Sequence, residues 1–362
     1  MMQNISSVIM AGGIGSRFWP VSTSDFPKQF HDILGTGETL IQQTYRRLLN
    51  LSTPEQILVV THKNYVALVK EQLPDLPEEN IIAEPARRNT APCITYAAYR
   101  IQAKDPTATM LVAPADHLIT NETEFTRVAN LACSEAESSK KLFTLGIQPH
   151  RPDTGYGYIQ FIDQGDDADS EVKVVKTFTE KPDVEMAKQF LESGDFLWNS
   201  GIFIWSVSTF MDELSNALPD MYASFEAGAD KFGTDEEADF INEMYPACEN
   251  ESIDYGLMEK SNHVHVIPAD FGWSDLGTWG SLHEHAKHDE NDNSILAPKA
   301  MIYETANSVV FLPKDKLGVI EGLDGYIVVD KGHSLLICRK DNEQLIKGFV
   351  NDIKMKFGDK HL

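Results

Sequence analysis

The chain has 362 residues, of which 42% are hydrophobic, so it is long enough to bury one large core or two unequal ones. Its 55 acidic and 31 basic residues give a formal net charge of −24, which repels polyanions and argues against nucleic acid or anionic membranes as partners. No apolar run approaches the roughly 20 residues that span a bilayer, and the first residues lack the features of a secretory signal. We therefore expect a globular, cytoplasmic protein.

The first part of the chain, to about residue 147, alternates apolar strand-like runs with segments of helical period. The predicted strands are 7–11, 56–61, 80–84, 108–113 and 142–147, and the predicted helices are 39–51, 64–73, 90–103 and 125–139. Such alternation indicates an α/β fold with a mixed, mostly parallel sheet and helices on both faces. Ligands bind such sheets at the carboxyl ends of the strands.

In the second part, between about 148 and 290, strands no longer alternate regularly with helices. Its predicted strands are 154–162, 172–182, 196–207 and 263–273, with a helix at 183–193. These strands are expected to extend the same sheet and to carry a second half of the site.

The polar stretch HDENDNSILAP suggests a domain boundary near residue 290. Beyond it, short strands are predicted at 300–305, 308–313, 317–322, 326–330 and 334–339, followed by a helix at 342–353. We therefore expect a large domain of residues 1–290 and a small β-rich domain of residues 291–362.

A glycine-rich loop, AGGIGSRFWP, follows the first strand. It fits neither the dinucleotide fingerprint, which needs a glycine where Phe18 stands, nor a Walker loop. Its glycines still let backbone amides approach a phosphate, and Arg17 adds a permanent charge. Lys28 ends a proline-stiffened loop and offers a second cation. A tight surface turn with solvated charges is the alternative.

Two aspartates are candidate magnesium ligands. Asp116 directly follows a buried strand, and Asp275 stands in the stretch FGWSDLGTW. Magnesium prefers one or two carboxylates together with substrate phosphate and water. The alternatives are that Asp116 caps the following turn and that Asp275 is the N-cap of a helix.

A third group suits a phosphorylated polyol. In FTEKPD, Glu180 can accept hydrogen bonds from hydroxyls while Lys181 holds phosphate. Asn199 can donate to and accept from hydroxyls, and Gly157 permits close backbone approach. A surface ion pair and a glycine bulge are the alternatives.

The stretch EPARRNTAP joins a strand to a helix that starts near Asn89 and Thr90. The first turn of that helix is expected to offer free amides to a base or phosphate, and Glu84 can accept from a purine's amino group. No serine, histidine and acid triad is evident, no histidine pair has metal-binding spacing, and the cysteine spacing argues against structural zinc.

Taken together, AGGIGSRFWP, FPKQF, PADH, TGYGYI, FTEKP, WNSGIF and FGWSDLGTW occur in the order found in sugar-nucleotide pyrophosphorylases. With RRNTAP, they most resemble the mannose-1-phosphate guanylyltransferases, over about residues 6 to 285. The resemblance implies a GT-A-like, Rossmann-like nucleotidyltransferase domain and, more weakly, a short left-handed β-helix at the C-terminal end. Bifunctional members carry a further isomerase domain, which we do not expect here.

The resemblance also implies the reaction, in which GMP passes from GTP to α-D-mannose 1-phosphate to give GDP-mannose and pyrophosphate with Mg²⁺ as cofactor. The implied catalytic residues are Arg17, Lys28, Asp116, Lys181 and Asp275, with Asp116 and Asp275 on the metal. The implied nucleotide-binding residues are Ala11, Gly12, Gly13, Gly15, Ser16, Glu84, Asn89 and Thr90. The implied sugar-phosphate residues are Gly157, Glu180, Lys181 and Asn199.

One departure from the family pattern is Thr23, where members often have an arginine, so one cation on the pyrophosphate side is missing. Two alternatives stay open: the same chemistry on another pair of nucleoside triphosphate and hexose 1-phosphate, and a catalytically silent nucleotide-sensing homologue. The short edge strands of the tail suggest a subunit interface, as in a homodimer.

Overall fold

The computed structural model describes residues 4–162 and 170–362, and the chain forms two compact units. The first unit comprises Met1–Gly12, Thr44–Ala115 and Ile119–Trp273. The second comprises Gly13–Gln43, Asp116–Leu118 and Ser274–Leu362. This grouping differs from the predicted division into residues 1–290 and 291–362, which stays a prediction about domains along the chain.

A nine-stranded sheet forms the centre of the first unit, in the order β3-β2-β1-β4-β9-β6-β10-β8-β7. Its strands are β1 (Ile5–Met10), β2 (Ile57–His62), β3 (Ile81–Glu84), β4 (Thr109–Pro114), β6 (Leu142–Ile147), β7 (Gly157–Ile162), β8 (Lys173–Glu180), β9 (Phe196–Ser206) and β10 (Val264–Ala269). Strands β3, β2, β1 and β4 are parallel, as are β6 and β10. Strand β9 runs antiparallel to both β4 and β6. The predicted mixed, mostly parallel arrangement is therefore confirmed.

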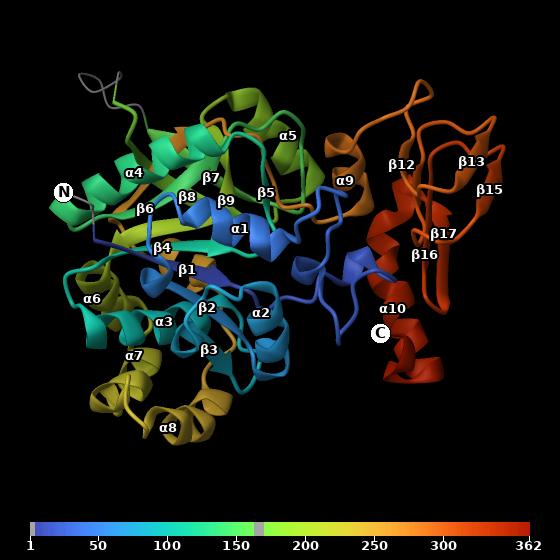
Figure 1. Ribbon diagram of the computed structural model, residues 1–362. Helices are drawn as coiled ribbons and strands as arrows, with labels where there is room; N and C mark the ends of the chain where they lie inside the picture. The colour runs from blue at the N-terminus through green and yellow to red at the C-terminus, as the bar shows by residue number, and fades with distance from the viewer. Residues whose placement is uncertain (1–3, 163–169) are drawn as a thin grey trace. The chain divides into compact units, whose positions relative to one another are not determined.

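Helices cover both faces of this sheet (Figure 1). Helix α3 (Thr90–Lys104), α6 (Val207–Ala217) and α7 (Pro219–Glu226) lie on one face, and α4 (Glu122–Ser138) lies on the other. The remaining helices that carry residues of this unit are α1 (Leu40–Leu48), α2 (Val66–Gln72), α5 (Val184–Ser193) and α8 (Glu237–Met244). The sequence pattern did not predict α6, α7 and α8.

A buried apolar cluster joins α3, α6 and α7 to the strands. Val8 of β1, Ile94 of α3, Trp205 of β9 and Phe210 of α6 all belong to it and are essentially inaccessible to solvent. Burial of a side chain of this size contributes about 1.5–3 kcal/mol. The sheet is thus held rigid from this face, while the polar side chains considered below follow the ends of its strands.

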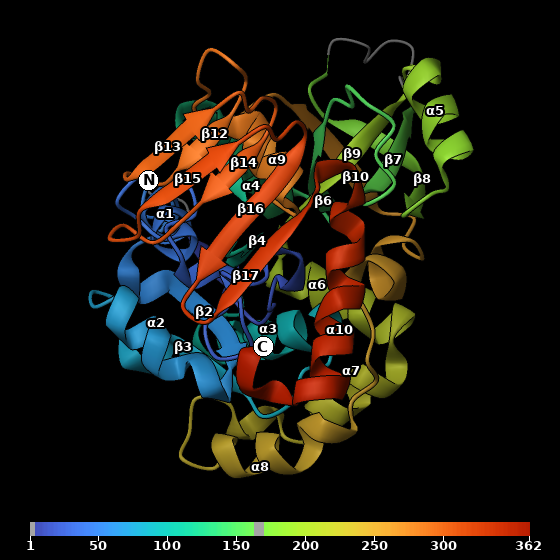
Figure 2. The ribbon, with the colours of Figure 1, turned by 90° about the vertical axis from the view of Figure 1, so that its right-hand side faces the viewer.

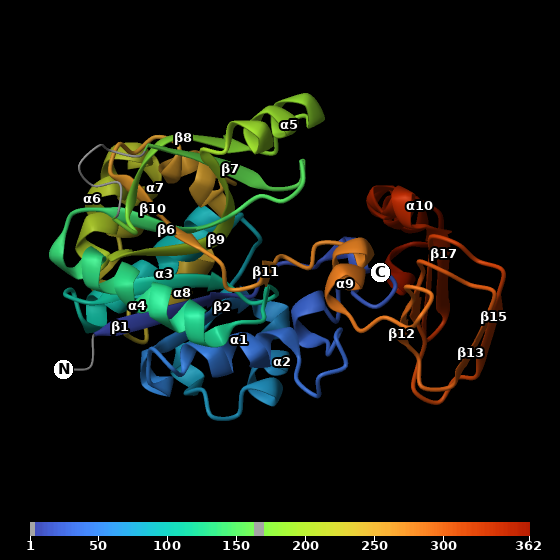
Figure 3. The ribbon, with the colours of Figure 1, turned by 90° about the horizontal axis from the view of Figure 1, so that it is seen from above.

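The second unit contains short, mostly parallel strands (Figures 2 and 3). One sheet has the order β12-β14-β16-β17, with β12 (Ser294–Leu296), β14 (Val309–Phe311), β16 (Tyr326–Lys331) and β17 (Ser334–Arg339). The other pairs β13 (Ala300–Tyr303) with β15 (Gly318–Glu321). Buried Val310, Leu312 and Val328 form a small core with partly buried residues of β13 and β15. The predicted short strands are confirmed.

Two helices complete the second unit, α9 (Trp279–His285) and the C-terminal α10 (Ile346–Phe357). Two short strands, β5 (Leu118–Ile119) and β11 (Trp273–Ser274), lie where the chain passes between the units. Within residues 4–162 and 170–362, none of the helices is long and apolar enough to cross a membrane.

Candidate active site

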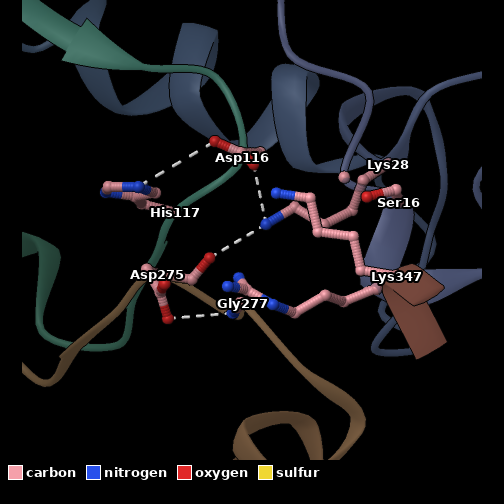
Figure 4. Close-up of a pocket in the computed structure, with 9 residues that line it drawn as sticks. Ser16, Lys28, Asp116, His117, Asp275, Gly277 and Lys347 are labelled. Carbon is pink, nitrogen blue, oxygen red and sulfur yellow. Dashed lines mark hydrogen bonds and ion pairs between the residues drawn. The ribbon is translucent and has the colours of Figure 1, made fainter. Parts of the chain in front are cut away.

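A polar cavity of about 250 Å³ lies in the second unit (Figure 4). Its lining residues are Gly15, Ser16, Arg17, Lys28, Asp116, His117, Asp275, Gly277 and Lys347. Six of these were predicted as site residues from sequence, and they come from three separate segments of the chain. His117, Gly277 and Lys347 were not predicted.

The side chain of Lys28 lies at the centre of this cavity and is only 3% exposed. Its Nζ lies 2.7 Å from Oδ2 of Asp116 and donates hydrogen bonds to the backbone carbonyls of Asp275, at 2.9 Å, and Leu276, at 3.1 Å. The ring of Phe18 lies 5.6 Å from the ammonium, within range of a cation–π contact. All three ammonium protons therefore have acceptors before any substrate binds.

Asp116 is the ion-pair partner of this buried lysine. Burial works against ionisation of its carboxyl, but the Lys28 ammonium and then His117 outweigh burial and hold the pKa of Asp116 below its ordinary value. The carboxylate is thus charged at neutral pH. Because this carboxylate pairs with Lys28 and lines the cavity, it does more than cap the following turn.

The glycine-rich loop is locked against the segment that carries Lys28. Gly15 has a φ of +73°, and a Cβ atom added there would lie 2.7 Å from Cβ of Lys28. Glycine meets both requirements, because it tolerates positive φ and needs no side-chain room. The amide of Lys28 donates to the carbonyl of Ile14, and Nε2 of Gln29 donates to the carbonyl of Gly13. A surface turn with solvated charges is therefore the wrong interpretation.

Asp275 does not cap the helix that follows it. Its Oδ1 accepts a hydrogen bond from the amide of Gly277 at 2.8 Å. The N-cap of α9 is Thr278, whose hydroxyl accepts from the amide of Ser281 at 3.1 Å. The N-cap alternative for Asp275 is therefore wrong, and its carboxylate lines the cavity.

Two further cations line the cavity. Nε of Arg17 is buried and makes no hydrogen bond within the described part of the chain. The side chain of Lys347, from the first turn of α10, makes no ion pair or hydrogen bond with any residue in 4–162 or 170–362. Apolar contacts of Ile346 and Val350 with the cluster that contains Phe18 hold α10 in place. Nothing in the sequence marked Lys347, since it stands in an ordinary helical pattern.

The predicted sugar-phosphate residues come together in the first unit. Gly157 of β7 lies opposite Glu180 of β8, and a Cβ atom at Gly157 would be only 2.3 Å from Oε2 of Glu180. The same position lies 3.4 Å from Cβ of Asn199. Lys181 pairs with Glu180 through its ammonium, and its own side chain is 59% exposed. The four residues thus form one cluster. A side chain at position 157 would collide with the carboxylate of Glu180, so this position requires glycine.

Asp254 belongs to this cluster and was missed from sequence. Its Oδ1 accepts a hydrogen bond from Nδ2 of Asn199 at 2.8 Å. Burial, and then the nearby Glu180, raise the pKa of Asp254 to about 6. It lies in an irregular helical segment that carries no recognisable motif.

Glu84 ends β3 in the first unit and is 4% exposed. It accepts a hydrogen bond from the hydroxyl of Tyr245, and its Oε2 would lie 3.2 Å from a Cβ atom at Gly12. Burial raises the pKa of Glu84 to about 7, although Tyr245 and Arg87 oppose the rise. Ala11, also buried, directly follows strand β1 and precedes Gly12. Gly12 therefore adjoins the buried carboxylate of Glu84, and Ala11 is the residue before it.

Asn89 and Thr90 have structural partners at the start of α3. Oδ1 of Asn89 accepts from the amide of Thr90 at 2.9 Å, and the hydroxyl of Thr90 accepts from the amide of Ile253. The amide of Ala91 donates to the carbonyl of Glu251. The expectation of free amides in this first turn is therefore wrong for two residues. The amide of Thr90 is bonded to the Asn89 side chain, and the amide of Ala91 is bonded to a distant loop.

Comparison with known proteins gives the family. The profile of the nucleotidyl transferase family matches residues 6–292. A mannose-1-phosphate guanylyltransferase of Escherichia coli is 35% identical over 369 residues, covering 100% of this chain and 78% of that relative. One of Klebsiella pneumoniae is 36% identical over 353 residues, covering 96% and 73%. A crystal structure described as mannose-1-phosphate geranyltransferase from Thermus thermophilus aligns with a TM-score of 0.86 at 28% identity, covering 97% of this chain and 100% of that one. The chain therefore belongs to the nucleotidyl transferase family and, within it, to the mannose-1-phosphate guanylyltransferases.

Proposed function

We propose that this chain transfers GMP from GTP to α-D-mannose 1-phosphate, giving GDP-mannose and pyrophosphate. The relatives named for this kind of transfer match nearly the whole chain. The observation that carries the proposal is the cavity in which the glycine-rich loop, three cations and two aspartates converge. Two anions must meet in this reaction, and such a cavity offsets their repulsion.

The chemistry requires positioning more than proton transfer. A phosphate oxygen of mannose 1-phosphate attacks the α-phosphorus of GTP in line, and pyrophosphate leaves. The attacking oxygen is already ionised, so no general base is needed. Arg17 and Lys347 would hold the triphosphate. Lys28 would add its positive charge, since its protons already have protein acceptors. Amides of the loop at Gly13, Gly15 and Ser16 would approach the phosphate oxygens.

Asp116 and Asp275 would hold a Mg²⁺ ion. The donor set fits, because two carboxylates line one cavity with the cations proposed to bind phosphate, and magnesium prefers few carboxylates with phosphate and water oxygens. When bound, the ion would neutralise charge on the phosphate oxygens.

The clusters of the first unit carry groups that suit a sugar and a base. Glu180, Asn199 and Asp254 offer acceptors to the mannose hydroxyls, with Lys181 on the sugar phosphate. Glu84, beside Ala11 and Gly12, would accept from the N–H groups of guanine. Asn89 stays part of the proposed base site, and Thr90 does so only through its side chain, since its amide is already bonded to Oδ1 of Asn89.

Four finer expectations are part of the proposal. The parallel, in-register stacking of β12, β14 and β16 supports a short left-handed β-helix within a domain of residues 291–362. The family profile ends at residue 292, which supports the division near 290. We also propose a homodimer and a cytoplasmic location.

The reaction is tested by the release of pyrophosphate from each nucleoside triphosphate with each hexose 1-phosphate in the presence of Mg²⁺. The expected result is a kcat/KM for GTP with mannose 1-phosphate at least about 100-fold above other pairs, because polar groups that lose their partners discriminate strongly. Turnover only with another pair would establish the alternative substrates. No turnover with any pair would indicate a silent homologue.

The magnesium ligands are tested by Asp275→Asn and Asp116→Asn. Each variant should lower kcat on the order of 10²-fold and raise the Mg²⁺ concentration for half-maximal rate. Asp275→Asn keeps an oxygen for the amide of Gly277, so its unfolding midpoint should not change. Asp116→Asn leaves the Lys28 ammonium without its carboxylate and should also cost about 3 kcal/mol of stability. The exposed Asp315→Asn is the control, and full activity of Asp275→Asn would remove this residue from the metal site.

Lys347 is tested by Lys347→Met, which keeps the apolar stem and removes the charge. The KM for GTP should rise about tenfold, since a charge-assisted hydrogen bond contributes about 1.5 kcal/mol. Lys356→Met is the matched control, because it lies on the same helix and does not line the cavity. Equal KM values in the two variants would show that Lys347 does not bind GTP.

Glu84 predicts a pH dependence of nucleotide binding. Because its pKa is raised to about 7, Glu84 gains a proton as the pH falls from 8 to 6 and loses acceptor capacity. The KM for GTP should therefore rise over this range, approaching tenfold per pH unit below 7. In Glu84→Gln this component should vanish, leaving only the titration of GTP itself. The same pH profile in both proteins would exclude contact between Glu84 and the base.

A further inference from the structure

Three side chains outside the active-site cavity meet at the end of α9. Oδ1 of Asp292 lies 2.8 Å from Nδ1 of His288, and its Oδ2 lies 3.6 Å from Nε2 of His283. One donor atom from each of the three residues lies within 4.8 Å of the other two. Two imidazoles and one carboxylate are a common ligand set for zinc and similar divalent metals.

The other ring nitrogens of this cluster already have partners. Nδ1 of His283 lies 2.7 Å from the hydroxyl of Ser294, and Nε2 of His288 lies 2.5 Å from the carbonyl of His283. A carbonyl can only accept, so Nε2 of His288 carries a proton. In a neutral imidazole, Nδ1 then presents a lone pair toward the carboxylate of Asp292. Nδ1 and Oδ1 lie at hydrogen-bond distance, so a shared proton, or a metal ion bound to both after a small side-chain rotation, would remove the repulsion between their lone pairs.

Hydrogen bonds within the loop between α9 and β12 fix the position of Asp292. Oδ1 of Asp289 accepts from the amides of Asn291 and Asn293, both at 2.9 Å, and its Oδ2 accepts from Nδ2 of Asn293. Asp292 has a φ of +60°, a conformation that asparagine and aspartate adopt more readily than most residues. Since the oxygens of Asp289 bind this loop's own N–H groups, the acidic stretch is not arranged as an oxygen-only calcium loop.

The cluster is also accessible. The side chain of His288 is 32% exposed and that of Asp292 is 60% exposed, while His283 is held in α9 with 8% exposure. An ion can thus enter from solvent, with one fixed ligand and two that rotate to meet it. One ring nitrogen of each histidine is bonded to an oxygen. Such bonds orient imidazole rings that bind a metal through the other nitrogen.

We propose that His283, His288 and Asp292 form a binding site for a zinc-class divalent metal ion, with a fourth position open to water. The ion ties the end of α9 to the loop that leads into β12. It is separate from the proposed magnesium site, whose donors are carboxylates only. The two histidines are five positions apart, which is not a recognised metal-binding spacing. The third ligand, Asp292, comes from the loop.

The experiment titrates the chelator-treated, dialysed full chain with Zn²⁺ against a chromophoric chelator. One ion should bind with a Kd in the micromolar range or below, and Co²⁺ in its place should give the visible absorption of a low-coordinate nitrogen and oxygen site. His288→Ala and Asp292→Asn should each weaken Zn²⁺ binding at least about tenfold. Both residues are exposed, so neither variant removes core packing.

His333→Ala is the matched control, since this exposed histidine lies in the β16–β17 turn outside the cluster. It should bind Zn²⁺ as tightly as the unchanged chain, and so should Asp275→Asn, which reports any binding at the proposed magnesium site. Zn²⁺ should raise the unfolding midpoint of the unchanged chain and of His333→Ala, but not of His288→Ala. Equal affinity in His288→Ala and the unchanged chain, or no stoichiometric binding, would overturn the proposal and leave a proton as the shared cation.

Discussion

The buried ammonium of Lys28 is the constraint on which the rest of the cavity depends. Removing an ammonium from water costs several kcal/mol unless nearby acceptors replace its hydration. Here the carboxylate of Asp116 and the carbonyls of Asp275 and Leu276 do so. These acceptors lie in segments far apart in sequence. The lysine therefore explains why the tripeptide Asp116–Leu118 groups with the second unit, while the strand before it belongs to the first.

The aromatic residues of the glycine-rich loop have a packing role that the loop's sequence does not reveal. Phe18 and Trp19 join the apolar cluster that includes Ile346 of α10, and Nε1 of Trp19 donates to the carbonyl of His361 at 2.8 Å. The loop thus holds the C-terminal helix, and that helix brings Lys347 to the cavity.

Sequence predicted what depends on local pattern. Alternating apolar runs located the strands, and with them the positions of Asp116 just past β4 and of Glu180 at the end of β8. The roles of these residues in substrate binding stay predictions. Sequence failed where partners come from irregular or helical segments far along the chain. Asp254 and Lys347 lie in such segments.

The errors have the same origin. The start of α3 seemed to offer free amides, but Glu251, about 160 residues away, accepts from one of them. The alternative role of Asp275 as the cap of α9 is wrong as well. The actual cap is Thr278, three residues later, and only the backbone geometry distinguishes the two.

Three carboxylates in the two units differ in their electrostatic surroundings. Asp116 lies beside an ammonium, so its pKa falls despite burial, whereas Glu84 and Asp254 are not compensated to the same extent and their pKa values rise to about 7 and 6. A carboxylate that stays ionised suits a metal ion and highly charged phosphates. A carboxylate near its titration point suits neutral N–H and O–H donors, because bonds from a base or a sugar replace the hydration that burial removed. The cation-rich cavity of the second unit and the carboxylate clusters of the first therefore match the charged and uncharged parts of a nucleotide and a sugar phosphate.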